Sequence, residues 1–166
     1  MTTAVFKTGL GWIGLATTMR GVSTVVLPKP TRQAVERALR GEGTQSADAE
    51  IHLRAARAAL SAYLEGTRRS FDLPLDLEGQ TAFRTKVWAV LQTIPYGRVR
   101  SYGWVARKVG RPRAARAVGA ACGANPVPLL VPCHRVVASD GSLGGFSGGL
   151  PTKKQLLRLE GIRLDR

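Results

Sequence analysis

Two residues able to do chemistry stand side by side in the stretch "VPCHRV" (131–136) of a chain with only two cysteines and two histidines. A thiol attacks as its thiolate, so a reactive Cys133 needs a base or positive surroundings, and His134 and Arg135 follow it directly. Adjacent side chains diverge, so His134 would act through a bridging water or after a sharp turn set by Pro132. Taken without its surroundings, the dipeptide favours a structural role over catalysis.

The segments on both sides frame a site around this pair. "NPVPLLVPCHRVV" (125–137) is a proline-stiffened approach, and the backbone of the glycine-rich "SDGSLGGFSGG" (139–149) can close over a planar ligand. The second cysteine, Cys122, fits packing near a helix end better than a second reactive thiol. The cysteine and histidine spacing matches neither a zinc site nor a disulfide framework, so we expect no structural metal and a reducing compartment.

Positive charge is concentrated around this segment. The chain has a formal charge of +14 and a pI near 11.2, which favours polyanionic partners. A solvated face normally mixes both signs, but no carboxylate occurs between Glu78 and Asp140. The basic residues in that interval are Arg84, Lys86, Arg98, Arg100, Arg107, Lys108, Arg111, Arg113, Arg116 and Arg135. The pattern predicts a nucleic-acid-binding domain.

Two short helices are expected inside the basic interval. Ser101 can cap a helix over "SYGWVARKV" (101–109), Gly110 ends it, and "RPRAARAVGAACG" (111–123) forms the second. The second helix is rich in alanine and glycine, and Arg116 is the long side chain in its middle. The pair indicates a helix-turn-helix, although an ordinary helical hairpin has a similar pattern.

The first 77 residues predict a small α/β lobe. Three apolar runs between residues 4 and 27 are separated by turn signals and predict an antiparallel meander, which fits better than a signal peptide. Thr31 can cap a helix ending near Arg40. A further helix over 49–64 is expected to bury Ile51, Ala55, Ala58, Ala59, Ala62 and Tyr63. No apolar run is long enough to span a membrane.

A linker, "FDLPLDLEG" (71–79), leads to a helix capped by Thr81, with Phe83, Val87, Val90 and Leu91 on one face. We place the domain boundary there. The expected fold is α+β: an α/β N-terminal lobe with a small antiparallel sheet (1–77), and a mainly helical domain (78–166) with a helix-turn-helix of winged-helix type.

Two long stretches together resemble a known family. "NPVPLLVPCHRVVASDGSLGGFSGGLPTKKQLLRLEG" (125–161) closely resembles the signature region of the O6-alkylguanine-DNA alkyltransferases, or methylated-DNA–protein-cysteine S-methyltransferases. Upstream, "FRTKVWAVLQTIPYGRVRSYGWVARKVGRPRAARAVG" (83–119) resembles the DNA-binding segment of the same family. The resemblance covers residues 78–162 strongly and the first 77 residues only loosely.

The resemblance implies a role for each matching residue of the reaction centre. Cys133 corresponds to the alkyl acceptor, His134 to the base that activates it through a water, and Glu160 to the carboxylate that orients the imidazole. Asn125 corresponds to the residue that ties the recognition helix to the active-site loop. Tyr102 corresponds to the tyrosine that crowds the rotating phosphate and hydrogen-bonds the flipped base.

It also implies how DNA and the base are held. The damaged base is flipped out of the stack, Arg116 takes its place, and a slim helix enters the minor groove. DNA contacts are expected from Ser101, Tyr102, Ala114, Ala115, Arg116, Ala117 and Gly119. In the pocket, the carbonyls of Cys133 and Val136 would face the guanine amino group and the Ser147 amide would face O6. Phe146 and Pro128 would line the pocket, and Phe146 stands where some relatives have tyrosine.

The implied activity is single-turnover transfer of an alkyl group from O6-alkylguanine, chiefly O6-methylguanine and also O4-methylthymine, to Cys133, without cofactor or metal. The implied partner is double-stranded DNA, with no membrane. We expect a cytoplasmic, nucleoid-associated protein that is a monomer in solution, with cooperative binding on DNA left open. The alternatives are a non-catalytic lesion sensor, a helix-turn-helix regulator, and a thiol hydrolase that would have no use for the basic block.

Overall fold

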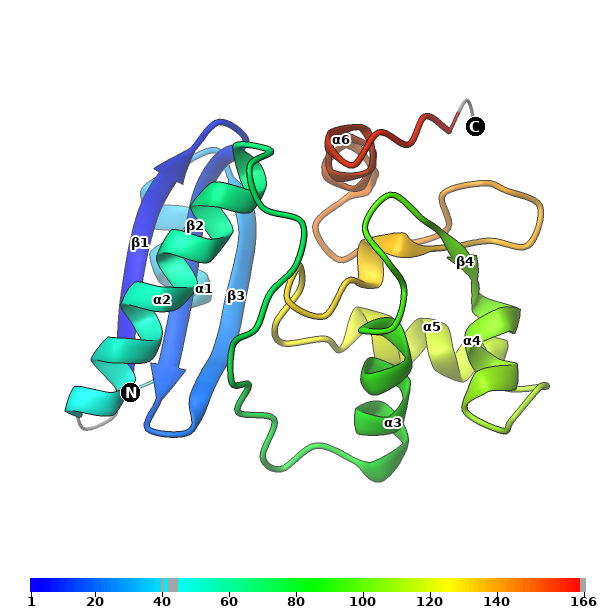
Figure 1. The fold of residues 1–166 in the computed structure, drawn as a ribbon, viewed down its shortest axis with the longest axis horizontal. Helices are drawn as coiled ribbons and strands as arrows, with labels where there is room; N and C mark the ends of the chain where they lie inside the picture. The colour runs from blue at the N-terminus through cyan, green and yellow to red at the C-terminus, as the bar shows by residue number, and fades with distance from the viewer. Residues whose placement is uncertain (40, 42–44, 165–166) are drawn as a thin grey trace. The chain divides into compact units, whose positions relative to one another are not determined.

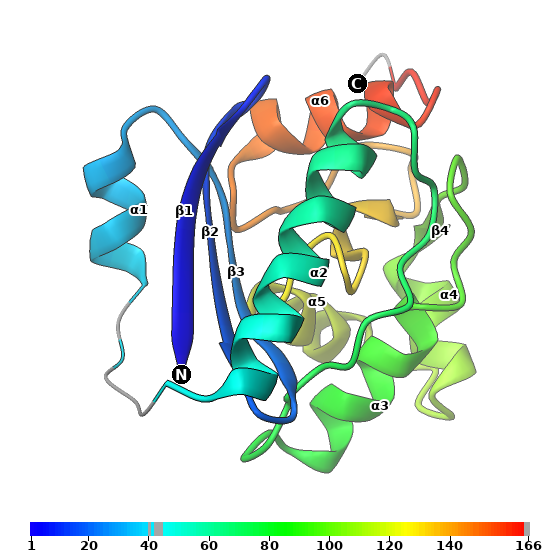
Figure 2. The ribbon, with the colours of Figure 1, turned by 60° about the vertical axis from the view of Figure 1, so that its left-hand side comes forward.

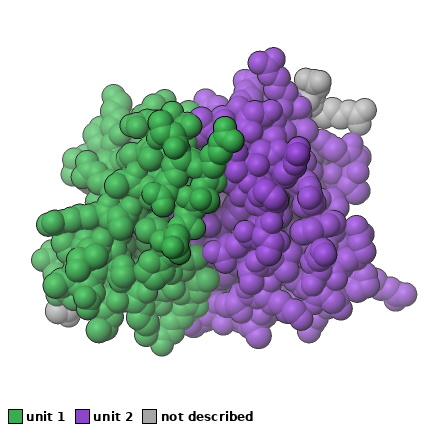
Figure 3. All heavy atoms as spheres, in the orientation of Figure 1, with its two compact units in different colours: residues 1–78 green, residues 79–166 purple. Residues whose placement is uncertain are grey.

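The computed structural model describes residues 1–39, 41 and 45–164. It divides into two compact units, Met1–Glu78 and Gly79–Arg166 (Figure 3). Within the described residues no helix is both long enough and apolar enough to cross a bilayer.

The N-terminal unit is a three-stranded antiparallel sheet with a helix on each face (Figures 1 and 2). Strands β1 (Thr2–Thr8), β2 (Gly11–Thr18) and β3 (Gly21–Lys29) lie in chain order, which confirms the predicted meander. The helices are α1 (Arg32–Ala38) and α2 (Ala47–Leu64). Gly14 in the central strand lets α1 approach, because a Cβ there would lie 2.5 Å from Val35 Cγ1.

Local capping chemistry sets the helix starts, but the predicted face of α2 is wrong. Thr31 caps α1 as expected, and the predicted end at Arg40 lies outside the described residues. In α2, Ile51 is 63% exposed, and the buried side chains are Ala49, Leu53, Ala56, Ala59, Leu60 and Tyr63. In an alanine-rich helix the few large apolar residues decide which face packs, and the predicted stripe omitted the two buried leucines, Leu53 and Leu60.

The C-terminal unit is mainly helical. Its helices are α3 (Ala82–Leu91), α4 (Tyr102–Lys108), α5 (Ala115–Gly123) and α6 (Leu150–Leu159), with a short 3-10 helix, η1 (Cys133–Arg135). The two-residue strands β4 (Arg100–Ser101) and β5 (Val136–Val137) pair in parallel. The α+β class predicted from the sequence is therefore confirmed.

The core of this unit centres on Trp88. Thr81 caps α3 as predicted, but Phe83 and Val90 are only half-buried, while Trp88 is fully buried beside Val87 and Leu91. Its indole Nε1 donates to the Ala121 carbonyl of α5 over 2.9 Å. This bond between α3 and α5 fixes the position of the second helix of the predicted helix-turn-helix.

Candidate active site

The thiol of Cys133 lies at the wall of a cavity of about 730 Å³. Cys133 begins the 3-10 turn after Pro132 and is 4% exposed. The cavity lining is mostly apolar and comes from α4, α5 and the glycine-rich loop. Its residues are Tyr102, Gly103, Ala115, Arg116, Gly119, Cys122, Gly123, Cys133, Ala138, Ser139, Gly145, Phe146 and Ser147. A thiol in such a wall can meet a planar ligand of the size of a nucleobase.

Glu160 is the centre of a buried hydrogen-bond network that includes His134, the residue after Cys133. Its Oε1 lies 2.7 Å from His134 Nε2, and its Oε2 accepts from the Gly97 amide over 3.0 Å. Arg135 donates to the same carboxylate from Nε and Nη2, both at 3.0 Å. The side chains of His134 and Glu160 are fully buried. A carboxylate only accepts, so His134 Nε2 carries the proton and Nδ1 is the basic nitrogen of the neutral ring.

Arg135 is a correction to the sequence analysis, which counted it among the cations available to nucleic acid. It is 7% exposed, and its Nη1 donates to the Ile94 carbonyl over 2.7 Å. Its charge neutralises Glu160 inside the protein. No sequence signal separated this arginine from its basic neighbours, because the pairing joins residues 25 positions apart.

The electrostatic environment of Cys133 and His134 means that the thiol needs a base in order to ionise. Burial raises the pKa of the Cys133 thiol, although a hydrogen bond with Asn125 and the positive charge of Lys153 act in the opposite direction. Burial lowers the pKa of His134, with Glu160 opposing that shift and Arg135 adding to it. At neutral pH the thiol is therefore protonated and the imidazole is neutral, which is the arrangement in which histidine can accept the thiol proton.

Lys153 is the functional residue that sequence reasoning missed. It is 0% exposed, and its Nζ donates to the carbonyls of Val136 (2.6 Å), Leu143 (2.5 Å) and Gly145 (3.1 Å). Burial lowers its pKa to about 8. The ammonium thus ties β5 to the glycine-rich loop and places a positive charge near Cys133. A signal existed, because Lys153, Leu156 and Leu157 follow helical spacing and form the buried stripe of α6, and Glu160 continues that spacing just after the helix.

Asn125 bridges the end of α5 and the segment that leads to Cys133. Its Nδ2 donates to the Val131 carbonyl over 2.9 Å, and its Oδ1 accepts from the Val127 amide over 3.0 Å. The residue is buried, so both bonds are shielded from water. Asn125 therefore links the residue that follows α5 to the segment that carries the thiol.

Tyr102 faces the glycine-rich loop from the start of α4. Its hydroxyl donates to the Gly145 carbonyl over 3.4 Å. Gly144 has φ +69°, and a Cβ there would lie 2.9 Å from the tyrosine ring, so this position requires glycine. Phe146 and Ser147 follow and line the cavity. The parallel β4–β5 pair brings Tyr102 beside the chain that follows Cys133.

Two residues expected in the pocket are absent from the described lining of the cavity, whereas Ser101 caps its helix and Cys122 packs near a helix end as expected. Pro128 and Val136 are buried, and the described lining of the cavity includes neither of them. The Val136 carbonyl already accepts from Lys153. Ser101 caps α4, with its Oγ accepting from the Trp104 amide over 3.0 Å. Cys122 lines the cavity with its pKa raised to about 12 by burial, so it is a protonated wall residue.

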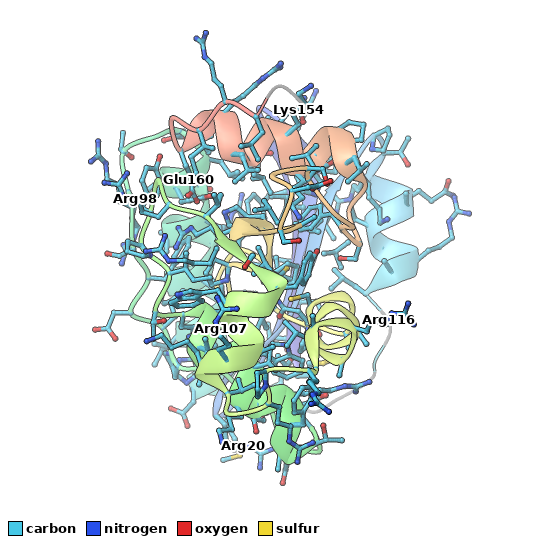
Figure 4. The ribbon with its side chains drawn as sticks, turned by 90° about the vertical axis from the view of Figure 1, so that its right-hand side faces the viewer. Arg20, Arg98, Arg107, Arg116, Lys154 and Glu160 are labelled. Atoms are coloured by element: carbon cyan, nitrogen blue, oxygen red, sulfur yellow. The ribbon has the colours of Figure 1, made fainter. Side chains whose placement is uncertain are left out.

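The second helix presents a slim surface. Ala115, Arg116 and Gly119 line the cavity, Ala117 is exposed, and Ala114 lies at the helix start. The side chain of Arg116 is exposed and points away from α5 (Figure 4). The helix has no long side chain on this face besides Arg116, so another macromolecule can approach its backbone closely.

Comparison with known proteins supports one family. Residues 82–162 match the family described as 6-O-methylguanine DNA methyltransferase, DNA binding domain. The chain is 54% identical over 101 residues to a methylated-DNA–protein-cysteine methyltransferase of Mycolicibacterium paratuberculosis, covering 61% of each protein. It is 47% identical over 112 residues to the protein of that name from Methanosarcina acetivorans, covering 68% of this chain and 71% of the relative.

Solved structures extend the likeness to both units. The crystal structure of Mycobacterium tuberculosis OGT in complex with DNA has a TM-score of 0.81 and 39% identity, covering 95% of this chain and 91% of that one. The O6-methylguanine-DNA methyltransferase of Pyrococcus kodakaraensis has a TM-score of 0.67 and 29% identity, covering 96% and 98%. The resemblance found in the sequence is confirmed, and the chain belongs to the methylated-DNA–protein-cysteine methyltransferase family.

Proposed function

We propose that this protein repairs O6-alkylguanine in duplex DNA, chiefly O6-methylguanine and also O4-methylthymine, by moving the alkyl group to Cys133. The observation that carries the proposal is the position of the thiol, in the wall of a cavity large enough for a base and next to the buried His134–Glu160 pair. Family membership and the DNA complex of the Mycobacterium tuberculosis relative support the same reading.

The reaction balances without an added cofactor. The Cys133 proton passes through a water to His134 Nδ1, and Glu160, which Arg135 holds in place, orients the ring while it carries that charge. The thiolate then attacks the alkyl carbon: the S–C bond forms, the C–O6 bond breaks, and the electron pair leaves with the guanine, which takes up a proton. The product thioether is not displaced by water, so each molecule acts once.

The base reaches the thiol by leaving the stack. A slim α5 suits the minor groove, and Arg116 would occupy the place of the flipped nucleotide. Ser101, Ala114, Ala115, Ala117 and Gly119 would follow the DNA backbone near Tyr102. In the pocket the Ser147 amide would meet O6, and Phe146 would pack on the alkyl group or base. We propose that α4 and α5 act as a helix-turn-helix of winged-helix type.

We further propose a division of labour between residues 1–77, with a structural role, and residues 78–166, which bind DNA and accept the alkyl group. The protein would work as a monomer in the cytoplasm, associated with the nucleoid. The basic side chains of the second segment would supply most of the affinity through phosphate contacts, so binding should weaken steeply as salt rises.

The decisive experiment is the intact mass of the protein after incubation with a duplex carrying one O6-methylguanine, followed by peptide mapping. We expect a single added methyl unit on Cys133, and none in Cys133→Ser. Methylation at Cys122 would overturn the assignment of the acceptor. An unchanged mass combined with lesion-selective binding would instead identify a non-catalytic lesion sensor.

A further inference from the structure

A second hollow of about 410 Å³ lies in the C-terminal unit, apart from the alkyl-acceptor cavity. The end of α3 and the chain after it contribute the apolar Val90, Ile94 and Pro95 and the polar Thr93. The wall of the hollow consists of Arg100, Trp104 and Lys108 from β4 and α4. We call these seven residues the Trp104 groove. None of them lines the alkyl-acceptor cavity.

The two hollows lie on opposite sides of α4. Successive residues of an α-helix turn by about 100°, so Trp104 and Lys108 project from the side opposite to Tyr102 and Gly103. Tyr102 and Gly103 line the cavity that contains Cys133. A ligand in the Trp104 groove would therefore leave the path of a flipped base open.

The groove combines an aromatic face with two cations. The Arg100 guanidinium carbon lies 5.4 Å from the Trp104 ring centroid, and Lys108 Nζ lies 5.5 Å from it. Both distances are within the range of a cation–π contact. Trp104 is half-buried and Lys108 is exposed, so the indole and the ammonium are accessible together.

No carboxylate of the described C-terminal unit is paired with these cations. Asp140 and Glu160 are its only acidic residues between 79 and 164. Glu160 is enclosed by His134 and Arg135, and Asp140 accepts from the Ser142 amide of its own loop. The positive charge of the groove is thus available to an external anion.

We propose that the Trp104 groove binds a short acidic and apolar peptide segment of a partner protein. A large apolar side chain would pack on Trp104 and the exposed Pro95. Flanking carboxylates would pair with Arg100 and Lys108. Tryptophan and arginine together are typical of the residues that carry most of the energy of a protein interface. The apolar part of the lining offers a surface for an apolar peptide side chain beside the two cations, which together match a segment that is both acidic and apolar.

The test measures binding of a fluorescein-labelled peptide, Asp-Glu-Leu-Phe-Glu-Asp with a blocked C-terminus, by fluorescence anisotropy at physiological ionic strength. We expect saturable binding that is weakened at least tenfold by Lys108→Glu and by Trp104→Gln. The matched control is Lys154→Glu, a lysine of α6 that does not line the groove and whose reversal changes the net charge equally. The control should change the affinity less than twofold, because it alters no side chain of the groove.

Three outcomes would overturn the proposal. Equal weakening by Lys154→Glu would mean that the basic surface attracts the peptide without a defined site. Equal binding of the peptide in which alanines replace leucine and phenylalanine would remove the role of Trp104. Absence of peptide binding, together with oligothymidylate binding that is lost in Lys108→Glu and Trp104→Gln, would identify a single-strand DNA site instead. Thermal unfolding followed by circular dichroism confirms that each variant is folded.

Discussion

Replacing Glu160 by glutamine should destabilise the protein strongly although the side-chain shape is preserved. The amide can still accept from the Gly97 N–H, but it cannot neutralise Arg135, whose side chain is only 8% exposed. Breaking a buried ion pair by removing one partner costs about 3–5 kcal/mol, because the other charge stays buried without compensation. Against a total stability of about 5–15 kcal/mol, this is a large share.

Urea unfolding followed by circular dichroism measures the loss. The matched control is Glu36→Gln in the exposed Arg32–Glu36 pair on α1, where the two side chains are 59% and 48% exposed. An exposed i,i+4 pair is worth only about 0.3–0.5 kcal/mol, so the control should unfold almost like the parent. A loss below about 1 kcal/mol in Glu160→Gln would refute the view that Glu160 compensates a buried arginine.

The same variant should change the dependence on pH. His134 has its pKa lowered by burial, so it takes up a proton on unfolding, and the stability of the parent protein falls as pH drops below about 6.5. Glu160 raises the pKa of His134 within the fold. Glu160→Gln therefore makes the acid loss steeper. An identical slope of stability against pH in both proteins would contradict the assigned tautomer and partner.

Lys153→Met should raise the pKa of Cys133, because a nearby positive charge is lost. The pH profile of alkylation by iodoacetamide should therefore move to higher pH. An unchanged profile would count against an electrostatic effect of Lys153 on the thiol. Arg116→Ala should slow repair of O6-methylguanine in duplex DNA more than reaction with free O6-benzylguanine, whereas equal slowing would exclude a function in base flipping. Gly144→Ala should destabilise by about 1–2 kcal/mol from backbone conformation, and by more from its approach to Tyr102, with a lower Tm and slower reaction with the free base. An unchanged Tm would show that the loop relaxes easily.

Short-range features were predictable from the sequence. The caps at Thr31, Thr81 and Ser101 were found because each depends on a hydroxyl and an amide three residues further along the chain. The antiparallel meander was found for a similar reason, since its turns are tight and its strands pair with their neighbours. The buried face of α2 was not predicted correctly. Alanine occurs on every side of this helix, so the few large apolar side chains decide which side packs against the sheet.

The candidate site likewise has parts that the sequence predicted and parts that it did not. The Cys133–His134 pair raised the possibility of thiol chemistry, and the stretch without carboxylates pointed to nucleic acid. The alkylguanine substrate and the roles of Asn125 and Glu160 came only from the resemblance to the family. Two further parts of the site depend on contacts between distant segments. In the sequence, Arg135 is indistinguishable from a surface cation. In the fold it is buried and paired with Glu160, which follows α6.

Lys153 likewise reads as an ordinary lysine early in a helix until the loop folds over it and offers three carbonyls. Sequence by itself determined which groups can react and where helices start, because those properties belong to single residues and near neighbours. Only the tertiary structure decided which charges are buried and paired, because burial requires segments that are far apart in the sequence to pack together and exclude water.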